Sequence, residues 1–97
     1  MTLNELEYLV ADTIILYEKE TKHAATRTRE MIQDLGAVEA LSRLMISGNL
    51  QQGFKVLRDR GLLERSFEHI VVHNQPFFKP EVIIAAQWRL DNPFILL

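Results

Sequence analysis

Two histidines, at positions 69 and 73, come nearest to the spacing of a metal site. On a helix, residues four apart project from one face, so the two imidazoles could share a divalent metal ion. No third ligand stands at a matching distance, and Glu68 precedes His69, which is the wrong order for the zinc motif H-E-x-x-H. We therefore predict surface or half-buried histidines here, with no metal and no cofactor.

Covalent catalysis and nucleotide binding also lack their usual motifs. The chain has no cysteine, and no serine lies in a G-x-S-x-G elbow or an S-x-x-K arrangement. The glycines are isolated, so no phosphate-binding loop is present. The carboxylate pairs Glu5/Glu7 and Glu18/Glu20 are two residues apart and would diverge on a helix. These features favour a protein that is not an enzyme.

The segment from residue 55 to 65 is the candidate phosphate-binding region. It has the outline of a helix-turn recognition element, and its cations are Lys55, Arg58, Arg60 and Arg65. Asp59 and Glu64 dilute this charge, and the formal net charge of the chain is −2, whereas DNA-binding domains are usually basic. Salt bridges to the acidic first helix, within the fold or across a dimer, are the simpler explanation. Nucleic-acid binding is kept as the alternative function.

The candidate residues named above lie in segments with helical patterns, and the first predicted helix begins at a capping box. Thr2 and Glu5 have the spacing in which each side chain accepts from a free backbone N–H at a helix start. The inward stripe of this helix follows at spacings of three and four: Leu3, Leu6, Val10, Ile14 and Tyr17. Other apolar residues widen the apolar surface beyond one stripe and indicate a central or interfacial helix: Leu9, Ile15 and Leu16.

Glycines divide the middle of the chain into three further helices. The second lies between Lys22 and Leu35 and stops at Gly36. The third follows from about Val38, ends at Gly48, and precedes Asn49 as a cap for the fourth. The fourth helix buries Phe54 and Leu57 and ends at Gly61.

The C-terminal third predicts a short fifth helix and a longer last one. Ser66 is a good N-cap, although the β-branched run at 70–72 leaves a short extended segment open as an alternative. Phe77 and Phe78 would anchor the connection in the core. Pro80 suits the first position of a helix over 81–90. The residues of that helix expected to face inward are Ile83, Ile84, Trp88 and Leu90.

Length and composition indicate one folded domain. The chain has 97 residues, of which 47% are hydrophobic and 25% charged, as in globular proteins. The fold class we predict is all-α, a compact bundle of five to six short helices over 1–97, with 91–97 as an apolar tail. The acidic N-terminus lacks the basic start of a signal peptide, and no apolar run is long enough for a membrane span. A cytoplasmic location without membrane contact is expected.

Residues 36–90 resemble a family pattern. The matching positions run Gly53-Phe54, Leu57, Gly61-Leu62-Leu63, Ser66, Glu68, Val71, Phe78, Glu81, Ala85 or Ala86, and Arg89-Leu90. This stretch resembles small uncharacterised bacterial and prophage-type helical proteins. The family pattern has an acidic residue and a Ser or Thr where Leu63-Glu64-Arg65 and Lys79 stand here. The resemblance implies a helical fold and a bacterial, phage-related or defence-related context, and it implies no activity.

The function we predict is that of a non-enzymatic protein–protein interaction or regulatory module. Its partner is another protein or a second copy of itself, which would make it a homo-oligomer. The tail is unusual because it is apolar, whereas chain ends are normally polar, so it must pack on its own domain or on a partner. The predicted interaction residues are Leu9, Ile15, Leu16, Phe94, Ile95, Leu96 and Leu97.

Overall fold

The computed structural model describes residues 2–47 and 52–94, and all regular structure in these two ranges is helical. The predicted all-α class is confirmed, with six α-helices in the described ranges. The helices are α1 (Leu3–Thr21), α2 (Thr26–Leu35), α3 (Ala37–Ile46), α4 (Gln52–Asp59), α5 (Phe67–Val72) and α6 (Pro80–Asp91), and two 3₁₀ turns are η1 (Leu63–Arg65) and η2 (Gln75–Phe77). None of these helices combines the length and the apolarity needed to cross a membrane.

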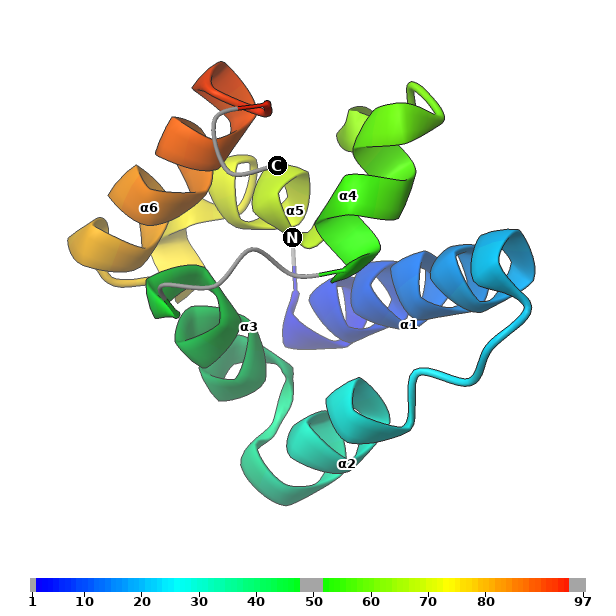
Figure 1. The fold of residues 1–97 in the computed structure, drawn as a ribbon. Helices are drawn as coiled ribbons and strands as arrows, with labels where there is room; N and C mark the ends of the chain where they lie inside the picture. Colours follow the sequence, from blue (N-terminus) through cyan, green and yellow to red (C-terminus); the bar gives the residue numbers. More distant parts are fainter. Residues whose placement is uncertain (1, 48–51, 95–97) are drawn as a thin grey trace.

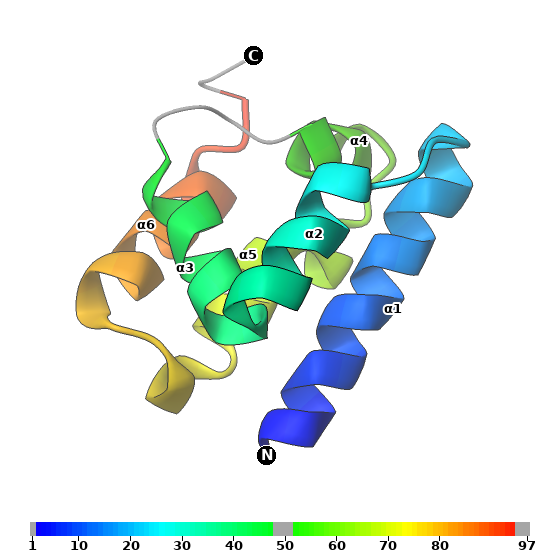
Figure 2. The ribbon, with the colours of Figure 1, turned by 90° about the horizontal axis from the view of Figure 1, so that it is seen from below.

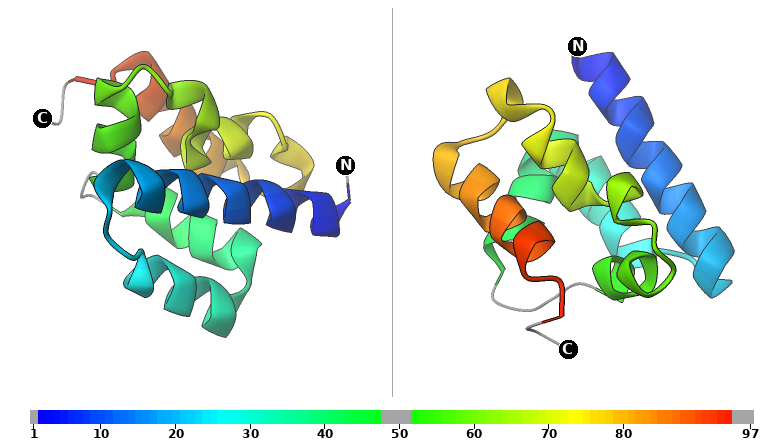
Figure 3. Two further views of the ribbon diagram at one scale, coloured as in Figure 1. Left: turned by 90° about the vertical axis from the view of Figure 1, so that its right-hand side faces the viewer. Right: turned by 90° about the horizontal axis from the view of Figure 1, so that it is seen from above.

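The short helix α5 lies at the centre of the arrangement (Figure 1). It packs against α6, α1 and α3, while α2 packs on α3 and α4 on α1. Seen from above, α1 and α6 flank α5 on opposite sides (Figure 3, right). Seen from below, α2 lies in front of α3 and beside α1 (Figure 2). The long helix α1 therefore forms one edge of the molecule, with one side packed and one side turned outward.

The helix boundaries follow the capping residues of the sequence. The Thr2 hydroxyl accepts from the Glu5 N–H at 3.2 Å, and the Glu5 carboxylate accepts from the Thr2 N–H at 3.0 Å, which confirms the capping box. The helix α1 ends at Thr21, and Lys22 adopts a left-handed conformation with φ 61°. The second helix therefore begins at Thr26, later than the polar pattern from Lys22 suggested, because the left-handed residue breaks the helical path.

Glycine and serine mark the other predicted boundaries. Gly36, with φ 83°, separates α2 from α3, and Gly61, with φ 70°, follows α4; both lie in the region that favours glycine. The Ser66 hydroxyl accepts from the His69 N–H at 3.2 Å and starts α5, so residues 70–72 are helical and the extended alternative is wrong. Pro80 is the first residue of α6, as predicted. The predicted roles of Gly48 and Asn49 lie outside the described residues.

The core is built from buried stripes of α1, α3, α4, α5 and α6, whereas α2 has no buried residue and only packs Met31 and Ile32 against it. One of these stripes was predicted wrongly. The stripe of α4 is the one expected, with Phe54 and Leu57 buried, and Phe78 is also buried. In α1 the expected Leu6, Val10 and Ile14 are buried, but Tyr17 is half-buried and Leu3, in the first turn, is 50% exposed. In α6, however, Ile84 is 68% exposed and Trp88 is 45% exposed. The buried positions of α6 are instead Val82, Ala86 and Arg89, spaced four and three apart, with Ile83 and Leu90 half-buried at the flank. A buried charge shifted the stripe, because Arg89 has a buried acidic partner.

Candidate interaction surface

The outward side of α1 carries the most exposed apolar side chains of that helix. Tyr8 is 73% exposed and Ile15 is 56% exposed, and exposed Ala11 lies between them at spacings of three and four. This spacing puts all three on one stripe, opposite the buried residues of the same helix. We call these three residues the α1 outer face. Of the predicted interaction residues on this helix, Ile15 belongs to it, whereas Leu9 is 38% exposed and Leu16 is half-buried at its flank.

One edge of α1 is tied to α2 through Glu18. The Glu18 carboxylate accepts two hydrogen bonds from the Arg29 guanidinium and one from the Ala25 N–H at 2.7 Å. The bonds from Arg29, followed by the one from Ala25, lower the pKa of Glu18 to about 2. Glu18 therefore holds the link between α1 and α2 in place and is not available to a partner.

The basic segment is partly used inside the fold. Arg60 forms a salt bridge to Glu20 of α1, with 2.8 Å between Nε and Oε2, which confirms an internal salt bridge to the acidic first helix. The Arg58 side chain is only 8% exposed. It donates to the Asp59 carboxylate at 2.9 Å and to the Pro93 carbonyl at 3.0 Å. Of the four predicted phosphate contacts, half-buried Lys55 and exposed Arg65 form no side-chain ion pair with residues 2–47 or 52–94.

The start of the apolar tail contacts its own domain. The Arg58 guanidinium lies over the Phe94 ring, 4.9 Å from its centre, and this position permits a cation–π interaction. Phe94 nevertheless remains 61% exposed, so one part of the ring is open to a partner. Ile95, Leu96 and Leu97, which complete the predicted interaction set, lie outside the described residues. The described part of the tail thus packs in cis through the contacts that Pro93 and Phe94 make with Arg58.

His69 and His73 lie side by side on α5 and its C-terminal cap. Their rings stack with centres 3.9 Å apart; His69 is half-buried and His73 is exposed. Burial, and then the nearby charge of His73, lowers the pKa of His69. In residues 2–47 and 52–94, no group of three or more His, Asp or Glu side chains is placed to hold a metal ion. The exposure of the two side chains is that of the predicted half-buried and surface histidines.

A buried ion pair between α5 and α6 was not expected from the sequence. Arg89 Nη1 donates to Glu68 Oε2 at 3.1 Å, and Arg89 Nη2 donates to the Ser47 carbonyl at 2.8 Å. The two side chains are 5% and 3% exposed. Burial raises the pKa of Glu68, while the hydrogen bond and charge of Arg89 oppose that shift. The position of Arg89, seven residues after Val82, was the one available signal that a charge lies on the buried stripe.

Comparisons with protein-family models, with curated proteins and with solved structures gave no match for this chain. No residue role is therefore transferred from another protein. The functional proposals rest on the exposed side chains of α1 and on the side chains that line one cavity.

Proposed function

We propose that this protein is a non-enzymatic interaction module that binds a second copy of itself through the α1 outer face. The observation that supports this proposal is the exposure of Tyr8 and Ile15, seven residues apart on the longest helix of the fold. Exposed apolar groups that gather on one face are typical of protein interaction sites. Ala11 between them is small, so a second helix can approach closely at that point.

The outer face suits an antiparallel pair of α1 helices related by a two-fold axis. With the axis near Ala11, Tyr8 faces the partner's Ile15, and Ile15 faces the partner's Tyr8. A two-fold interface needs such self-complementary contacts, because each surface meets its own copy. The interface then contains two equivalent contacts, and in each of them the Tyr8 ring of one copy covers the Ile15 side chain of the other.

Charge favours the antiparallel over the parallel arrangement. Glu5 lies near the start of α1 and Lys19 near its end, and both are exposed. An antiparallel pair brings Lys19 close to the partner's Glu5 at both ends of the interface, whereas a parallel pair would place like charges together. Such rim pairs contribute only about 0–1 kcal/mol each, so they select orientation more than they add affinity.

The expected dimer is weak. The helix α1 has 19 residues, which corresponds to a length of about 28 Å. One pair of such helices buries less area than the roughly 1,200–2,000 Å² of a standard stable interface. We therefore expect dissociation in the micromolar range or above, so that the protein exchanges between monomer and dimer as its concentration changes.

Sedimentation velocity from about 5 µM to about 500 µM tests the proposal, since this range brackets a micromolar dissociation constant. The wild-type chain should shift from monomer to dimer across the range. Ile15→Glu places two negative charges in the apolar centre of the interface and should leave a monomer. Ile84→Glu is the matched control, because Ile84 is 68% exposed on α6 at the opposite side of α5, and it should dimerise as the wild type does.

Two results would overturn the proposal. A wild-type chain that remains monomeric at the highest concentration has no self-association to explain. A dimer that survives Ile15→Glu but is lost in Ile84→Glu uses α6 and not α1. A truncation that lacks residues 94–97 measures the predicted contribution of the tail: a dimer weakened by it includes the tail in the interface, and an unchanged dimer confines the interface to α1.

A further inference from the structure

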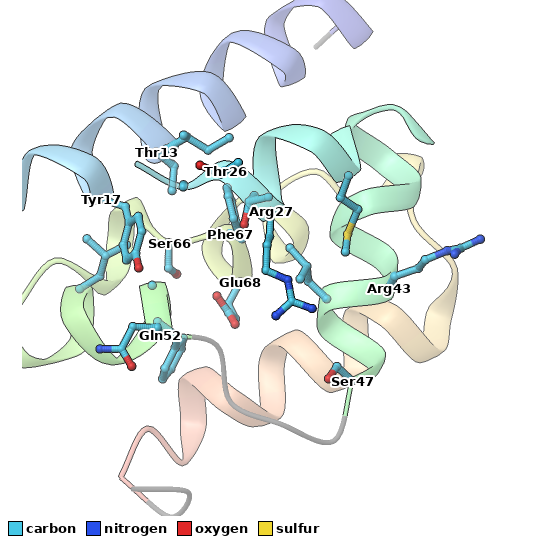
Figure 4. Close-up of a pocket in the computed structure, with 18 of the residues that line it drawn as sticks. Thr13, Tyr17, Thr26, Arg27, Arg43, Ser47, Gln52, Ser66, Phe67 and Glu68 are labelled. Carbon is cyan, nitrogen blue, oxygen red and sulfur yellow. The ribbon is translucent and has the colours of Figure 1, made fainter. Parts of the chain in front are cut away.

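A cavity of about 620 Å³ lies between the packed side of α1 and the first turns of α2, α4 and α5 (Figure 4). Its size is within the range of about 300–1,000 Å³ that small-molecule sites occupy. Large apolar side chains form much of its wall: Tyr17, Leu44, Phe54 and Phe67. A ligand with an apolar body would thus leave water on entering it.

Of the charged side chains that line the cavity, all but one cation form an ion pair within the described residues. Glu68 lines the cavity but is paired with Arg89, and Arg43 lines it but is paired with exposed Glu39. Arg27, an exposed residue of the first turn of α2, lines the cavity at its edge and forms no ion pair with any residue in 2–47 or 52–94. Its side chain extends from α2 toward the interior of the cavity (Figure 4). The cavity therefore has walls of mixed apolar and hydroxyl-bearing side chains and, within the described residues, one positive charge that forms no ion pair.

The start of α2 lies next to Arg27, and its N-cap N–H, that of Ala25, is already bonded to the Glu18 carboxylate. The N-cap residue of α2, Ala25, makes no side-chain capping bond, and Thr26, Arg27 and Thr28 of the first turn all line the cavity. The free N–H groups and the dipole at a helix start favour negative charge nearby. The helix start acts here only as a supplement to the guanidinium, which supplies the full charge.

We infer that this cavity binds an apolar carboxylic acid, with the carboxylate on the Arg27 guanidinium and the apolar body among Tyr17, Phe54 and Phe67. A guanidinium presents two parallel N–H donors that match the two oxygens of a carboxylate. A single cation suits a monoanion, whereas a phosphate dianion needs more donors. The inference is independent of self-association, because none of these residues belongs to the α1 outer face.

Titrations followed by ¹H–¹⁵N correlation spectra provide the test, with 1-naphthaleneacetate and octanoate as probes and 1-naphthaleneacetamide as the neutral isostere. The acids should shift the amide signals of cavity residues. The naphthalene acid should bind about tenfold more tightly than its amide, which corresponds to one charge-assisted hydrogen-bond pair at a partly exposed site. Arg27→Gln should remove this difference, while Arg27→Lys should retain part of it.

Arg65→Gln is the matched control, because Arg65 is an exposed cation that does not line the cavity, and it should bind the acid as the wild type does. The spectrum of free Arg27→Gln, compared with that of the wild type, verifies the fold. Equal affinity for acid and amide in the wild type would overturn the inference, as would an Arg27→Gln variant that keeps the preference. Absence of binding by both acids at millimolar concentration would also overturn it.

Discussion

Arg89→Met is the substitution that should most change the stability of this domain. It removes the cation from Glu68, whose side chain is only 3% exposed, and also the donor to the Ser47 carbonyl. Breaking a buried ion pair from one side costs about 3–5 kcal/mol. Burial already raises the pKa of Glu68, so once Arg89 is removed this carboxyl takes up a proton more readily than a carboxyl of ordinary pKa would. We therefore expect the low end, about 3 kcal/mol, of a total of roughly 5–15 kcal/mol.

Urea and thermal unfolding, followed by far-ultraviolet circular dichroism, measure the effect. A loss of about 3 kcal/mol corresponds to a fall in Tm of roughly 12–24 °C for a domain of this size. Arg43→Met is the matched control: it breaks an exposed ion pair with Glu39 on one helix and should cost less than about 0.5 kcal/mol. The double variant Glu68→Leu/Arg89→Met leaves no charge at these two buried positions and should regain most of the stability.

The dependence on pH gives an independent check with a definite sign. Without Arg89 the pKa of Glu68 should rise further above its ordinary value of 4.5, because burial remains while the hydrogen bond and the charge of Arg89, which lower the pKa, are lost. A carboxyl with a raised folded-state pKa contributes stability that is full below the unfolded-state value and is lost as pH rises. The deficit of Arg89→Met should thus shrink from neutral pH toward 4.5. A loss no larger than that of Arg43→Met, or a double variant as unstable as Arg89→Met, would refute the reasoning.

Two other substitutions test the local contacts. Glu18→Gln removes a carboxylate whose pKa is lowered to about 2 from 4.5, so the wild type should lose stability as pH falls through this window and the variant should lose less; parallel stability profiles in acid unfolding would contradict this. Ser66→Ala removes the N-cap of α5 and should cost about 1–2 kcal/mol in urea unfolding. Ser42→Ala, which only loses a bond to a carbonyl within α3, should cost less, and equal losses would contradict the capping role.

The helix boundaries could be predicted from the sequence because they depend on local interactions. The capping box at Thr2, the positive φ of Gly36 and Gly61, the cap at Ser66 and the first-turn Pro80 each involve residues within a few positions of one another. Such signals are legible in a single chain. The start of α2 was predicted too early in the sequence because no capping residue marks it. Its N-cap is Ala25, whose methyl group cannot accept a hydrogen bond from the backbone.

The buried stripe of α6 could not be predicted in the same way. Judged by the apolarity of their side chains alone, Ile84 and Trp88 are better suited to the core than Arg89. The cost of burying Arg89 is offset by Glu68, which is 21 positions earlier and on another helix. The same limit applies to the cavity, because Tyr17, Arg27 and Phe54 belong to three helices and only the packing brings them together. Contacts between distant segments decided both features.

Two acidic side chains of α1 form salt bridges within the fold, and this separates folding from association. Glu18 and Glu20 of α1 bind Arg29 and Arg60, so two positions along the helix hold α2 and the turn after α4. On the α1 outer face, by contrast, Tyr8 and Ile15 remain more than half exposed. Substitutions at Glu18 or Glu20 should therefore change unfolding, whereas Ile15→Glu should change the oligomeric state and leave the Tm of the monomer nearly unaltered. An interface differs from an exposed part of the core in this respect: a substitution in the interface alters assembly, whereas a substitution in the core alters stability.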